Sequence, residues 1–66
     1  MIPDDANIRF CATVMIANFG EEAAKVAAAR ADDYLVAGNT EGQLTWLRIV
    51  KAIDELQKMQ PNETKQ

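Results

Sequence analysis

The chain offers few side chains that could carry out chemistry, and Cys11 is the first of them. A catalytic cysteine needs a base that converts its thiol to a thiolate. The 66-residue chain contains no histidine and no second cysteine. These counts argue against a nucleophilic thiol, an internal disulfide and a zinc site. Because Cys11 shares a helical face with apolar residues, we expect it to be a buried, unreactive side chain.

The acidic pair Asp32 and Asp33 is the second candidate, either for cation binding or for acid–base catalysis. Neighbouring residues on a helix point about 100° apart, so the two carboxylates do not converge on one ion. We therefore expect both to lie in solvent. The glycines Gly20, Gly38 and Gly42 are too far apart to form a phosphate-binding loop. The sequence thus predicts no catalytic, metal-binding or cofactor-binding residue, no cofactor and no enzymatic activity.

Trp46 and Tyr34 are candidates for recognition, because both residue types are enriched in protein interfaces. Trp46 lies in an apolar stripe at helical spacing, so we interpret it as an anchor of the core. For Tyr34 a core position and an interface position fit the sequence equally well, since its hydroxyl needs water or a partner.

Turn signals divide the chain into the helix-sized pieces that must position these residues. Phe19-Gly20 ends the first piece, and Ala37-Gly38-Asn39-Thr40 separates the second from the third. Apolar residues recur at helical spacing in each piece, and none alternates as a strand does. We predict an all-α fold, a compact three-helix bundle with helices over about 4–19, 21–37 and 40–59.

Short connections make sequential helices near-antiparallel neighbours. The three helices form a single domain over residues 1–60, and we expect the polar segment 61–66 to be a disordered tail.

The second and third helices have different apolar faces. The second is a face of small residues, which predicts a close helix–helix contact: Ala24, Ala27, Ala28, Ala31 and Leu35. The third carries the most regular amphipathic stripe: Trp46, Ile49, Val50, Ile53 and Leu56. We expect the third helix to open with a capping box between Thr40 and Gln43.

The first helix carries two apolar stripes. The main one contains Ile8, Cys11, Ala12, Met15, Ile16 and Phe19, and the second contains Phe10, Val14 and Ala17. A helix that is apolar on two sides is normally buried on two sides. Either the other two helices flank it, or the second stripe meets a partner. In the latter case the interface is predicted at Phe10, Val14, Ala17, Leu44 and Leu47.

The composition narrows the possible partners. A net charge of −3 argues against nucleic acid and anionic membranes, which select clusters of Lys and Arg. Glu41, at the start of the third helix, argues against a DNA-binding helix-turn-helix. The acidic N-terminus does not resemble a signal peptide, and a single thiol fits the cytoplasm. A chain this short buries only about 60% of its unfolded surface, which leaves regular helix packing and self-association as ways to stabilise it.

One run of residues resembles a group of short, uncharacterised, all-helical bacterial proteins. The run covers residues 6 to 57 and includes Phe19-Gly20, Ala27 to Ala31, Leu35, Gly38, Glu41-Gly42, Trp46, Ile49 and Ala52-Ile53 to Leu56. The resemblance implies a helical cytoplasmic protein and supplies neither an activity nor site residues. Members with a histidine before the glycine differ from this chain, which has Phe19 there.

These observations predict a non-enzymatic, helical protein–protein interaction module that forms a homodimer or binds another protein. A small-ligand-binding helical protein and a helix-turn-helix-like regulator are the alternatives. A ligand retained through purification favours the former, and salt-dependent retention on DNA favours the latter.

Overall fold

The computed structural model describes residues 5–58, and these are helical almost throughout. The elements are α1 (Asp5–Phe19), the 3₁₀ turn η1 (Gly20–Glu22), α2 (Ala23–Val36) and α3 (Thr40–Lys58). No strand occurs among residues 5–58, so the predicted all-α fold is confirmed. The predicted tail, 61–66, and the outermost predicted helix residues, 4 and 59, lie outside the described residues.

The junction of α1 and α2 differs from the prediction. Gly20 has a φ of 57°, a left-handed conformation that turns the chain, and η1 carries helical backbone directly into α2. The second helix therefore begins at Ala23 rather than at residue 21. The described residues form two continuous runs of helical residues, 5–36 with its bend at Gly20 and 40–58, rather than the three helices of the predicted bundle, each separated by a turn.

The turn from α2 to α3 ends one helix and caps the next. The backbone N–H groups of Gly38 and Asn39 donate to the carbonyls of Leu35 and Tyr34 at 3.0 and 2.9 Å. This is the Schellman pattern, and Gly38 supplies its left-handed residue with a φ of 79°.

Asn39, rather than Thr40, then caps α3. Its Oδ1 accepts a hydrogen bond from the backbone N–H of Gly42 at 2.9 Å. The predicted capping box between Thr40 and Gln43 is therefore wrong. Asn and Ser lead Thr as N-cap residues, and Asn39 stands one position earlier.

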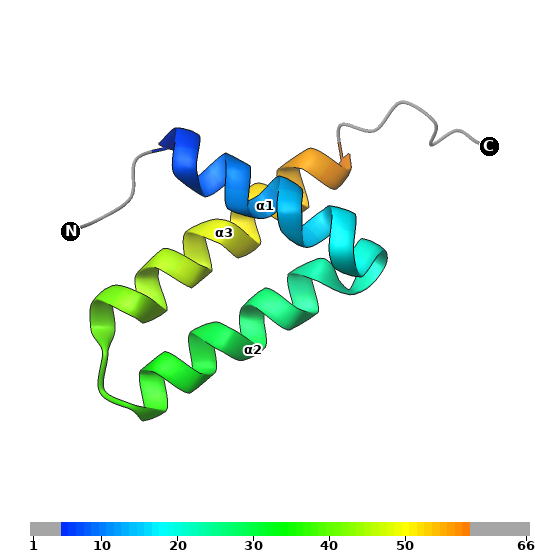
Figure 1. Cartoon of the computed structure of the whole chain (residues 1–66). Helices are drawn as coiled ribbons and strands as arrows, with labels where there is room; N and C mark the ends of the chain where they lie inside the picture. The colour runs from blue at the N-terminus through cyan, green and yellow to red at the C-terminus, as the bar shows by residue number, and fades with distance from the viewer. Residues whose placement is uncertain (1–4, 59–66) are drawn as a thin grey trace.

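Figure 1 shows α2 and α3 running antiparallel as a hairpin, with α1 crossing over it. The crossing lies at the end of the hairpin that is opposite the α2–α3 turn. At that end the side-chain amide Nε2 of Gln57 donates to the carbonyl of Gly20 at 3.0 Å. The last turns of α3 are thereby tied to the junction of α1 and α2.

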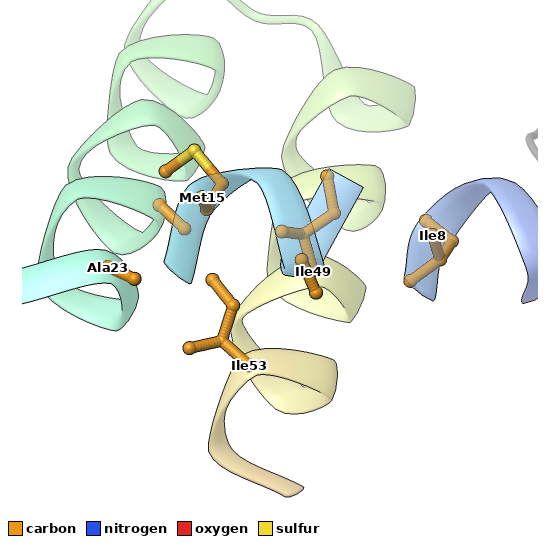
Figure 2. Packing of buried hydrophobic residues seen from close by; sticks show 7 residues of the cluster. Ile8, Met15, Ala23, Ile49 and Ile53 are labelled. Carbon is orange, nitrogen blue, oxygen red and sulfur yellow. The ribbon is translucent and has the colours of Figure 1, made fainter. Parts of the chain in front are cut away.

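The core gathers side chains from α1, α2 and α3 (Figure 2). Its buried residues are Ile8, Ala12, Met15, Ala23, Ala27, Ala31, Ile49 and Ile53. Four of these eight are alanines, and Ile53 is the largest side chain that is fully enclosed. The alanine face of α2 is confirmed at Ala27 and Ala31. It begins at Ala23, which the prediction missed, and excludes Leu35, whose side chain is 55% exposed.

Gly42 allows the ring of Tyr34 on α2 to pack against the backbone of α3. A Cβ atom at Gly42 would lie 2.5 Å from Cδ1 and 2.8 Å from Cγ of Tyr34. The phenol ring therefore occupies the space of the missing side chain. The contact accounts for a glycine within the first turn of a helix, where alanine has the better intrinsic propensity.

We expect Ala31→Leu to lower stability, because it adds three carbons at a position that is 2% exposed. Overpacking of this kind costs about 1–3 kcal/mol. Ala29→Leu makes the same change at an exposed position of α2 and is the matched control. Thermal unfolding followed by circular dichroism measures both. Equal melting temperatures for the two variants would contradict the packing described above.

We expect Gly42→Ala to destabilise the chain although alanine favours helix formation, because the new methyl group meets the ring of Tyr34. In a Tyr34→Ala background the same change should instead stabilise α3, by about 0.5–1 kcal/mol. Denaturant unfolding of the four proteins forms a double-mutant cycle. A gain in stability from Gly42→Ala in the wild-type background would show that the ring does not occupy this space.

Candidate interaction surface

α1 is covered on one side only. Its buried residues, Ile8, Ala12 and Met15, face the hairpin. We call the opposite side the outer stripe: Phe10, which is 68% exposed, Val14, which is 40% exposed, and Ala17, also exposed. The alternative in which the other helices flank α1 on both sides is therefore wrong, because no described element covers the outer stripe.

Cys11 is exposed, so the prediction of a buried thiol is wrong. The predicted main stripe was too broad. Cys11 lies about 100° around the helix from Ala12, whereas the face in contact with the hairpin is centred on Ala12, which is 0% exposed. Phe19, at the end of the same stripe, is 42% exposed. A helix that rests on one hairpin buries a narrower face than a helix enclosed in a bundle.

The outer side of α1 carries no charge. Asp5 and Arg9 are the charged residues of this helix, and none occurs from Phe10 to Gly20. Two of its polar side chains are bonded to their own helix. Thr13 Oγ1 donates to the carbonyl of Arg9 at 2.9 Å, and Asn18 Nδ2 donates to the carbonyl of Val14 at 3.0 Å. The surface beside the outer stripe is therefore neutral, with these donors already satisfied.

Leu44 and Leu47, the other predicted interface residues, lie on α3 and are 54% and 44% exposed. They point away from the buried Ile49 and Ile53, as their spacing along the helix requires. An open groove of about 330 Å³ runs beside them, lined by Glu41, Leu44, Thr45, Leu47, Arg48 and Lys51. All of these residues belong to α3, so the groove lies on a second surface, on a different helix from the outer stripe.

A further open groove, of about 420 Å³, separates the start of α1 from α3. Its lining mixes both signs of charge: Asp5, Ile8, Arg9, Arg48, Lys51, Ala52, Glu55 and Leu56. This is where the small-ligand alternative would place its ligand.

Within residues 5–58, no group of three His, Cys, Asp or Glu side chains could hold a metal ion.

The aromatic residues support the packing. Trp46 is half-buried and packs against the core, as its place in the apolar stripe predicted. The guanidinium carbon of Arg30 lies 5.5 Å from the centroid of its ring, a cation–π contact between α2 and α3. Tyr34 fills the space above Gly42 and remains 38% exposed.

Asp32 and Asp33 lie in solvent, as expected from their spacing.

Comparison with family models, curated proteins and solved structures finds no match to this chain. A functional conclusion therefore depends on the chain's own surfaces.

None of the helices formed by residues 5–58 has the length and apolar character needed to cross a membrane.

We expect Cys11 to react with a thiol reagent in the dilute native protein about as fast as in the unfolded chain, because its side chain is exposed. The rate of modification by a chromogenic disulfide measures this, with Cys11→Ser as the blank. Strong protection in dilute solution would show that another part of the chain covers this side of α1.

Proposed function

We propose that this chain is a non-enzymatic helical protein–protein interaction module that self-associates through the outer stripe of α1. The observation that carries the proposal is the distribution of large apolar side chains among the described residues. Four are buried: Ile8, Met15, Ile49 and Ile53. Five more are partly buried against the core: Ile16, Val26, Trp46, Val50 and Leu56. Eight are exposed: Phe10, Val14, Phe19, Tyr34, Leu35, Val36, Leu44 and Leu47.

This distribution leaves the isolated chain short of stabilising burial. Burial of apolar surface contributes about 25 cal/mol per Å², and an alanine brings little of it. In a small domain the conformational entropy lost on folding nearly cancels that gain. Covering the outer stripe with a partner adds burial without any change of fold, and a second copy of the chain is always present as such a partner.

The chemistry of the chain supports an interaction role over a catalytic one. Cys11 is exposed but the chain has no histidine to act as its base. We include a cytoplasmic location in the proposal, because an exposed lone thiol is maintained in a reducing compartment. The exposed Leu44 and Leu47 on α3 form a second surface through which larger assemblies or other proteins could be bound.

We expect Phe10→Ser to weaken self-association, because it removes the most exposed aromatic ring of α1 while leaving the core intact. Sedimentation equilibrium from micromolar to millimolar concentration measures the effect, with circular dichroism to check helix content. Val36→Ser is the matched control, since Val36 is 88% exposed on α2. If the wild-type chain sediments as a monomer at millimolar concentration, self-association is excluded.

A further inference from the structure

We propose that two copies of the chain pair through their α1 helices in antiparallel orientation, about a two-fold axis at the level of Ala12. Phe10 of each copy then packs against Val14 of the other. This inference rests on the proposed function, because it requires that the outer stripe of α1 binds a second copy. It adds the orientation and register of the pair, which follow from the spacing, size and charge of the residues on that side.

The spacing is that of a helix–helix seam. Asn7, Phe10, Val14 and Ala17 follow one another at intervals of three, four and three residues, and all four are exposed. This is the spacing of the a and d positions of a coiled coil, which place their side chains between those of a facing helix. The side of α1 that faces away from the hairpin is thus arranged to receive another helix.

The sizes of these side chains select the antiparallel orientation. A parallel pair would place Phe10 against Phe10 at one end and Ala17 against Ala17 at the other. The two rings would hold the helices apart and leave a gap between the alanines. The antiparallel pair instead contains two equal layers of Phe10 against Val14, with Asn7 opposite Ala17 outside them. Large side chains then face smaller ones at an even separation, which is how closely packed helices interdigitate.

The charges favour the same surface. The chain has a net charge of −3, so two copies repel each other over much of their surfaces. No charged residue lies between Phe10 and Gly20, so this repulsion is weakest where two outer stripes meet.

The extent of the contact sets the strength of the pair. One 15-residue helix per copy forms a smaller interface than the roughly 800 Å² per partner of a standard complex. We therefore expect a reversible dimer that forms at high micromolar concentration and dissociates on dilution.

Cys11 reports the orientation directly. With the axis at the level of Ala12, the two Cys11 residues lie on the same flank of the seam, offset by about 3 Å along the helices. In a parallel pair they would lie on opposite flanks. A cysteine at position 17 would distinguish the two orientations in the opposite sense. Two residues at that position are about 15 Å apart along an antiparallel pair and directly opposed in a parallel one.

The test uses three full-length proteins treated with a short bifunctional maleimide, at a concentration where the wild type sediments as a dimer. They are the wild type, Cys11→Ser with Ala17→Cys, and Cys11→Ser with Ala29→Cys. The last carries an exposed thiol on α2 and measures crosslinking by random collision. We expect the wild type to form a covalent dimer at least ten times faster than either variant.

The outcomes separate the two proposals. A wild-type chain that remains monomeric at millimolar concentration overturns both. A dimer in which the position-17 variant crosslinks and Cys11 does not is parallel, and overturns only the inference made here. A dimer in which neither position crosslinks faster than the α2 control is formed through another surface, such as that of Leu44 and Leu47. That result overturns the pairing of α1 but leaves self-association in place.

Discussion

The structure depends on the close approach of α2 to α3. Small residues permit it: α2 presents Ala23, Ala27 and Ala31, and α3 presents Gly42 to the ring of Tyr34. Two helices in such close contact bury little apolar area per residue, because alanine and glycine have little to bury. The large buried side chains therefore come from farther along the same face of α3, at Ile49 and Ile53, and from α1. This is why the enclosed core is centred on Ile49 and Ile53 where α1 crosses the hairpin.

The same constraint explains why α1 is exposed on its outer side. The hairpin of α2 and α3 presents an apolar face at the core, and α1 covers that face with Ile8, Ala12 and Met15. No further described helix remains to cover the other side of α1. Phe10 and Val14 are thus exposed by the topology of the chain, and an incomplete core and an apolar outer surface are two results of one packing arrangement.

Much of this fold could be predicted from the sequence. The helical class, the alanine face of α2, the core position of Trp46 and the glycines at both turns follow from periodicity and backbone sterics, which are local properties. The predictions failed where tertiary packing decides the outcome. Cys11 and Leu35 belong to apolar stripes, but how much of a stripe is buried depends on the width of the surface it meets.

The candidate surface shows the same division between local and tertiary information. The second apolar stripe of α1 was recognisable from spacing alone, but its exposure required knowledge of where the hairpin lies. The choice of Asn39 over Thr40 as the cap of α3 depended on which residue ends the Schellman turn. The bond from Gln57 to Gly20 joins residues 37 positions apart, and no sequence motif indicates it.

That bond has a consequence for the order in which the chain opens and closes. The hairpin of α2 and α3 is joined by a short turn and can form by local contacts, at a small cost in loop-closure entropy. The docking of α1 requires the junction at Gly20 to meet the far end of α3, where Gln57 holds it. The greater separation along the chain therefore predicts that α1 docks after the hairpin has formed, and its docking adds Ile8, Ala12 and Met15 to the core.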